Sequence, residues 1–228
     1  MSQISVYSGE DIISSRKAFL EHLERLKNED FEIYRVAGKD ITEESLALLS
    51  SPTSLFGQKR VLVIENLLAG TKSKEKNKII QIVSLLNCAL VLWENKNFTK
   101  GDQLKYPNFV FKNFKLPQVL FKFLDSLSPK KINDNLRLFR EAIKSTDPNF
   151  LFLMLIRQIR LLILASDKND LLKLAPWQKA KLQKQAQFFS LDELKQINRR
   201  LLQIDFEQKT SRTPFLIEKQ LEILLTEI

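Results

Sequence analysis

The sequence predicts two domains of different class: an α/β domain over residues 1–115 and an all-α helical bundle over residues 116–228. Short β-like runs alternate with helical periods in the first half, which is typical of a parallel sheet flanked by helices. Beyond Pro117 the apolar patterns all have the period of a helix. The 228 residues include only 5 glycines and 7 prolines, which favours long regular elements over a loop-rich all-β fold.

In the first half, strands are expected where apolar residues run continuously or alternate with polar ones. The expected strands are residues 4–7, 31–36, 60–65 and 89–93, with a candidate fifth at 108–111. The runs RVLVIE at 60–65 and ALVLW at 89–93 are largely apolar, which indicates strands buried on both faces. Helices are expected at residues 11–26, 42–49 and 74–86, the second beginning with Thr42 as N-cap.

In the second half, the apolar periods predict helices only. They are expected at residues 116–127, 133–144, 149–165, 176–188, 190–207 and 214–225. Ser190 and Glu193 have the spacing of a capping box. The most apolar helix, 149–165, is interrupted by Arg157 and Arg160, whereas a membrane span needs about 20 mostly apolar residues. We therefore expect a buried core helix.

The turn after the first strand does not have the residues of a phosphate-binding loop. Such a loop needs glycines that let backbone N–H groups approach the phosphates, followed by Lys and Ser or Thr. Here the turn reads Ser-Gly-Glu-Asp at residues 8–11, with one glycine and two acids. Acids at a helix start disfavour a bound phosphate, so no nucleotide cofactor is expected. Without that loop, Glu65, which ends the strand at 60–65, is interpreted as a surface acid rather than a catalytic one.

No other residues form a catalytic or metal-binding constellation. The single His22 lies in a polar stretch and is expected to be exposed, and the single Cys88 lies in an apolar one. One histidine and one cysteine leave no ligand set for zinc, and no disulfide can form within the chain. We therefore expect a non-enzyme without metal. The start of the chain has no signal-peptide pattern, so a soluble, cytoplasmic protein is expected.

The net charge of +9 is spread along the chain without a block of like charges. A basic surface favours polyanions such as DNA, or an acidic protein partner. A general lysine-rich soluble surface explains the same charge equally well.

One loop carries two large apolar side chains. Ser54, Leu55 and Phe56 lie between the helix at 42–49 and the strand at 60–65. The pair can fold back onto the domain's own sheet, or it can dock into a pocket on a partner. Each such side chain gains about 1.5–3 kcal/mol on full burial, which suits an interface anchor.

Several motifs, in order, resemble the delta subunit family of the bacterial DNA polymerase III clamp loader. They are SLFGQKR at 54–60 followed by VLVIEN, FKFLDSL at 121–127, MLIRQIRLL at 154–162, PW at 176–177, FSLDEL at 189–194 and DFEQKT at 205–210. The resemblance implies an AAA+-like α/β domain without a phosphate loop and a helical collar-like domain. The sequence departs from the family because no lid domain is evident between the α/β domain and the collar-like domain. It also has Ser51 where the clamp-binding consensus favours Gln.

The resemblance implies a non-catalytic subunit that binds the sliding clamp, or beta subunit, and helps to open it during DNA replication. Ser54, Leu55 and Phe56 would bind the clamp. Arg157, Gln158, Arg160 and Lys209 would contact other loader subunits (gamma/tau, delta prime) or DNA within the complex, although pairing inside the bundle explains these residues as well. Two alternatives stay open: a degenerate clamp-loader adaptor, and a basic DNA-binding protein without clamp-opening activity.

Overall fold

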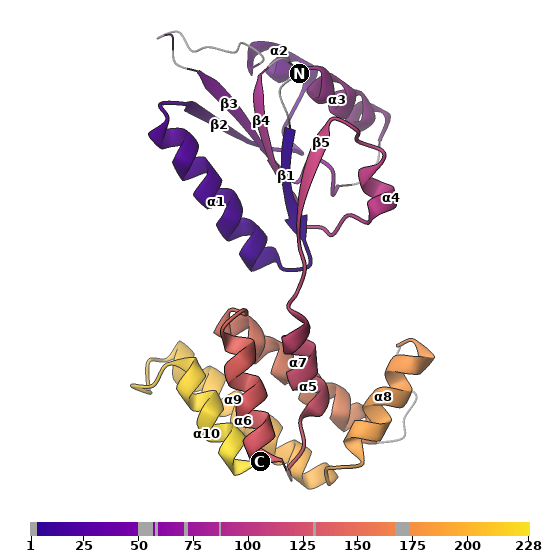
Figure 1. The fold of residues 1–228 in the computed structure, drawn as a ribbon, viewed down its shortest axis with the longest axis vertical. Coiled ribbons are helices and arrows are strands. Elements are labelled where there is room, and N and C mark those ends of the chain that lie inside the picture. The colour runs from indigo at the N-terminus through magenta and orange to yellow at the C-terminus, as the bar shows by residue number, and fades with distance from the viewer. Residues whose placement is uncertain are drawn as a thin grey trace. The chain divides into compact units, whose positions relative to one another are not determined.

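The structure is a computed structural model that describes residues 4–49, 57, 59–70, 73–86, 88–129, 131–166 and 174–228. The chain divides into two compact units, Met1–Lys115 and Leu116–Ile228. The first is an α/β unit and the second is all-α (Figure 1). The predicted fold class, an α/β unit with a parallel sheet plus an all-α helical bundle, is confirmed.

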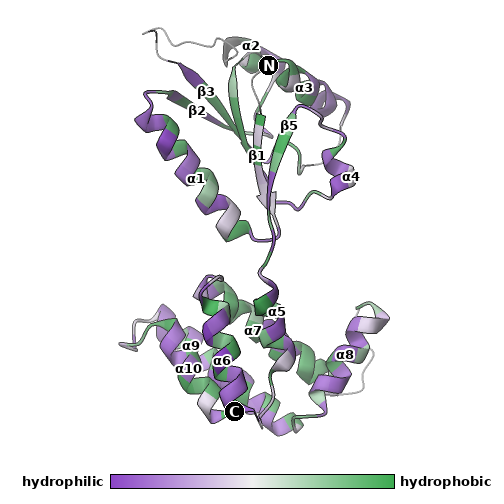
Figure 2. Cartoon of the chain, viewed as in Figure 1, coloured by the Kyte–Doolittle hydropathy of each residue, from purple (hydrophilic) through white to green (hydrophobic). Residues whose placement is uncertain are grey.

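Within the described part of the α/β unit, five parallel strands form one sheet in the order β2-β3-β4-β1-β5. The strands are β1 (Ile4–Gly9), β2 (Glu32–Ala37), β3 (Arg60–Glu65), β4 (Ala89–Trp93) and β5 (Phe109–Phe114). The candidate fifth strand is thus a real one, and it extends three residues beyond the predicted end at residue 111. Figure 2 shows that β4, the central strand, is hydrophobic along its length, as expected for a strand covered on both faces.

Helices cover the two faces of the sheet unequally. They are α1 (Ile12–Asn28), α2 (Glu43–Leu49), α3 (Lys74–Leu85) and the short α4 (Lys100–Gln103), which the sequence analysis missed. Because side chains alternate along a strand, Tyr7, Val63 and Val91 pack against Phe19 and Leu23 of α1. The alternate strand residues pack with the segments that carry α2, α3 and α4 on the opposite face (Figure 1).

The second unit is a helical bundle with a continuous apolar core. Its helices are α5 (Gln118–Ser126), α6 (Ile132–Ile143), α7 (Pro148–Ser166), α8 (Pro176–Ala186), α9 (Leu191–Lys209) and α10 (Ile217–Glu227). In α7, the buried residues that join this core are Leu151, Phe152, Leu155, Ile159, Leu162 and Ala165. In the described ranges, α7 is the one helix whose length and composition would allow it to cross a membrane. The prediction that this helix packs into a core is confirmed.

The predicted helix caps are confirmed. The Ser190 hydroxyl accepts a hydrogen bond from the backbone N–H of Glu193 at 3.2 Å, and the Ser190 N–H donates to the Glu193 carboxylate at 2.6 Å. Thr42 and Ser45 exchange the equivalent pair of bonds at the start of α2. Each cap satisfies backbone N–H groups that a helix start leaves without partners.

Candidate functional site at the carboxyl edge of the sheet

The sheet has one crevice position where ligands commonly bind in parallel α/β folds. Such ligands lie outside the carboxyl ends of neighbouring strands whose connections leave over opposite faces. Strands β1 and β4 are neighbours of this kind, because β1 leads into α1 on one face and β4 leads to Phe98 on the other. The side chains at this edge therefore decide whether the unit can hold a phosphate or another ligand.

The turn from β1 to α1 is occupied by the chain's own acidic side chain. Asp11 is the N-cap of α1, and its carboxylate accepts hydrogen bonds from the Ser14 N–H at 2.9 Å and the Ser14 hydroxyl at 2.7 Å. Asp11 is buried. A carboxylate therefore lies where an anion would otherwise approach the start of the helix, and it opposes a phosphate group there.

The same turn lies directly against strand β5. Gly9 has a φ of 144°, and a Cβ at this position would lie 2.0 Å from the Phe114 carbonyl oxygen. The Asp11 N–H donates to that same oxygen at 3.1 Å, and the Gly9 N–H donates to the Lys96 carbonyl at 3.3 Å. Gly9 is thus required for close backbone packing rather than for an open phosphate cradle.

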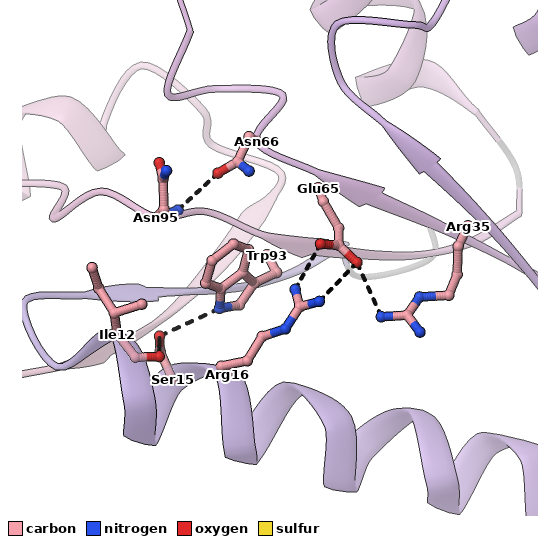
Figure 3. Close-up of polar contacts among 8 residues, drawn as sticks. All are labelled: Ile12, Ser15, Arg16, Arg35, Glu65, Asn66, Trp93 and Asn95. Atoms are coloured by element: carbon pink, nitrogen blue, oxygen red, sulfur yellow. Dashed lines mark hydrogen bonds and ion pairs between the residues drawn. The ribbon is translucent and has the colours of Figure 1, made fainter. Parts of the chain in front are cut away.

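Glu65, at the end of β3, is bound by two arginines (Figure 3). The Glu65 carboxylate pairs with Arg16 of α1 at 2.7 Å and with Arg35 of β2 at 3.0 Å. Partial burial alone would raise the pKa of Glu65, but hydrogen bonds and positive charge from Arg16 and Arg35 outweigh burial and lower it. The Arg16 guanidinium also lies 4.5 Å from the centre of the Trp93 ring. The interpretation as a simple surface acid is therefore corrected: Glu65 is a half-buried, ion-paired link between α1, β2 and β3.

Two asparagines and Trp93 connect the ends of β3 and β4 (Figure 3). The Asn66 side-chain oxygen accepts from the Asn95 N–H at 3.0 Å, and the Asn66 N–H donates to the Trp93 carbonyl at 2.8 Å. Asn66 has a φ of 59°, a left-handed conformation that asparagine tolerates better than most residues. The Trp93 indole N–H donates to the Ser15 hydroxyl at 3.4 Å, which joins this edge to α1.

Glu94 is a buried acid that the sequence analysis missed. It follows β4 directly, is fully buried, and accepts the N–H groups of Leu68 and Ala69 at 2.8 Å each. Burial raises the pKa of Glu94 to about 7, although these N–H groups act in the opposite direction. An acid directly after a buried strand was visible in the sequence, but its enclosure depends on the loop after β3.

His22 is partly buried, so the prediction of an exposed histidine is wrong. Its ring centre lies 5.6 Å from that of Tyr7. Burial lowers the pKa of His22, and the positive charges of Lys112 and Arg25 lower it further. Its Nδ1 atom is buried and has no hydrogen-bond partner within the described ranges. His22 lies three residues after the buried Phe19, and residues at this spacing share a helix face.

The predicted clamp-binding residues Ser54, Leu55 and Phe56 lie outside the described residues. For metals, the described ranges hold no group of three or more His, Cys, Asp or Glu side chains that could bind an ion.

The predicted subunit or DNA contacts are spread over two helices of the bundle. Arg157 and Arg160 are exposed on α7, and Lys209 is exposed at the end of α9, where it pairs with Asp205 at 2.7 Å. Gln158 donates to the Gln185 side-chain oxygen on α8 at 2.7 Å. Gln158 thus links two helices of the bundle, whereas Lys209 pairs within its own helix, and the contact role of these four residues stays a prediction.

Comparison with known proteins gives a distant match in structure only. No protein-family model matches the sequence, and no curated protein matches it. Among solved structures, the chain is similar to the DNA clamp loader delta protein of Bacillus subtilis, with 14% sequence identity and a TM-score of 0.45. That match covers 100% of this chain and 95% of the other. A likeness at this level does not assign a family, so family membership stays a prediction from the motifs.

Proposed function

We propose that this protein is a non-catalytic, clamp-loader delta-like subunit that binds a DNA sliding clamp and favours its open form. The observation that supports this most is the closed carboxyl edge of the sheet. A carboxylate caps α1, and the Gly9 turn lies against β5, at the place where a nucleotide-binding relative would hold phosphates. A unit built in this way acts by binding, and ATP would be hydrolysed by partner subunits.

Clamp binding is assigned to Leu55 and Phe56 on the basis of the sequence resemblance. Ring opening then requires that this segment binds the open or strained clamp more tightly than the closed one, because a ligand shifts an equilibrium only through differential affinity. The helical unit would join this protein to the other loader subunits.

The test is a titration of the protein against the sliding clamp of the same organism, with the Leu55→Ala, Phe56→Ala double variant in parallel. The variant should bind at least about tenfold more weakly, because each buried side chain contributes about 1.5–3 kcal/mol. A matched control is the Leu85→Ala, Leu104→Ala double variant, which removes two apolar side chains that are 79% and 82% exposed elsewhere in the same unit. If wild type and the Leu55/Phe56 variant bind equally, the assignment is wrong. If neither binds, the adaptor or DNA-binding alternative takes its place.

A further inference from the structure

The helical unit contains an apolar groove between α5, α7 and α8. Its volume is about 330 Å³, which is large enough for one or two side chains of a partner. The apolar residues that line it include Phe121, Leu124, Met154, Leu161 and Leu182. Such a mixture of leucine, methionine and aromatic side chains is typical of grooves that receive peptide segments.

Trp177 and Phe121 place aromatic rings at the border of this groove. Trp177 is 67% exposed and Phe121 is 40% exposed, although both line the groove. An indole left in water beside an apolar hollow is the kind of residue that dominates protein interfaces when a partner covers it. Phe188, which is 57% exposed and follows α8, does not line the groove and so provides a matched comparison.

A partly buried amide network ties together the helices that line the groove. Gln158 on α7 donates to Gln185 on α8, and the Gln185 amide donates to the carbonyl oxygens of Leu124 and Leu127 at 2.8 and 3.1 Å. These bonds tie α8 to both α5 and α7. Because buried polar groups are costly to leave without partners, the network fixes the spacing of the three helices. The groove is therefore preorganised.

The surroundings of the groove are positively charged. Helix α7 contains two arginines and α8 three lysines, and neither helix contains an acidic residue. Among the described residues that line the groove, the acidic one is Asp125, and its carboxylate is paired with Lys181. Arg157 also lines the groove and makes no ion pair within the part of the chain that the structure describes. Charge complementarity therefore favours an anionic occupant.

We propose that this groove binds a short peptide segment of a partner protein in which a large apolar side chain stands beside acidic residues. The apolar side chain enters between Phe121 and Trp177, and a carboxylate of the peptide pairs with Arg157. A concave aliphatic floor suits a side chain better than a nucleic-acid strand, which binds along a groove lined by several cations. The proposal concerns the helical unit alone and does not depend on clamp binding by residues 54–56.

The proposal is tested by selecting random peptides displayed on phage against the full-length protein. Selected peptides should combine Asp or Glu with Phe, Leu or Trp, and a synthetic copy should change the fluorescence of Trp177 on binding. Trp177→Ala and Arg157→Glu should each weaken that peptide by at least about tenfold. Phe188→Ala, which removes an exposed aromatic outside the groove, should leave its affinity unchanged.

Three results would overturn the proposal. In the first, selection yields no enriched peptide, or enriches peptides without acidic residues. In the second, the selected peptide binds the Trp177→Ala and Arg157→Glu proteins as tightly as wild type. In the third, an oligothymidylate competes with the peptide and loses affinity in the same two variants, which would make the groove a nucleic-acid site. All three results leave the clamp titration with the Leu55→Ala, Phe56→Ala variant to be judged by its own outcome.

Discussion

Replacing Glu94 should destabilise the α/β unit in a way that depends on pH. In Glu94→Ala the buried N–H of Leu68 and the partly buried N–H of Ala69 lose their acceptor. A buried donor without a partner costs about 1–3 kcal/mol, so the free energy of unfolding should fall by roughly 2–5 kcal/mol. Glu94→Gln keeps one acceptor oxygen and should cost about half as much.

The pH dependence follows from the raised pKa of Glu94, about 7 in the folded protein against an ordinary value of 4.5. Between pH 4.5 and about pH 7, Glu94 is protonated in the folded state and ionised in the unfolded state. The stabilising contribution of this proton is therefore fully present below about pH 4.5 and is lost as the pH rises through about 7. The advantage of wild type over Glu94→Gln should shrink with rising pH in this window, by up to about 1.4 kcal/mol per pH unit.

The measurement is urea unfolding of both proteins at several pH values from about 5 to 8, the range in which the linkage acts. Trp93 fluorescence reports on the α/β unit if both proteins also carry Trp177→Phe, because Trp177 belongs to the other unit. Taking the difference between the two proteins cancels the titration of all other groups, including His22. A difference that stays constant across this range would refute a raised pKa for Glu94. A cost below about 1 kcal/mol for Glu94→Ala would refute the role of its carboxylate as acceptor.

Two further predictions concern the same unit. Gly9→Ala should lower the free energy of unfolding by more than about 2 kcal/mol, because its Cβ would meet the Phe114 carbonyl at 2.0 Å in a φ region that alanine avoids. Thermal unfolding measures this loss, and an unchanged melting temperature would contradict the close packing. The pKa of His22 is lowered in the folded protein, so as the pH falls below about 6.5 the unfolded state protonates His22 more readily than the folded state does. The free energy of unfolding therefore decreases as the pH falls. His22→Phe should flatten this acid-side slope in urea unfolding, and an unaltered slope would show that His22 titrates normally.

The periodic parts of the fold could be predicted because their causes are local. The predicted strands 60–65 and 89–93 have the observed bounds of β3 and β4, because a short, largely apolar run that includes β-branched residues is typical of a buried strand. The Ser190 and Glu193 cap needs residues only three apart. Helix α4 was missed because four residues with no buried side chain leave no apolar period to detect.

The chemistry of the carboxyl edge could be predicted only in part, because its contacts join distant residues. The acids in the β1–α1 turn were visible, and one of them, Asp11, is the N-cap of α1. The partners of Glu65 are 49 and 30 residues away, in Arg16 and Arg35, and no local pattern connects them. The burial of Glu94 depends in the same way on backbone groups 25 and 26 residues away.

Lys59, which follows the predicted clamp-binding segment in the sequence, lies at the amino edge of the sheet, opposite to the closed carboxyl edge. The chain enters β3 through Lys59, whose carbonyl accepts the N–H of Glu32 at 2.8 Å, at the amino edge of β2 and β3. Residues 54–56 precede this point, whereas Gly9 and Glu94 lie at the carboxyl ends of β1 and β4. A partner that contacts the amino edge beside Lys59 does not need the carboxyl edge to open. The internal contacts at that edge can then serve rigidity alone, since an anchor gains affinity when the scaffold that presents it is already ordered. Under the proposed function, Glu94→Gln, in conditions in which it stays folded, should bind the clamp as tightly as wild type in the same titration.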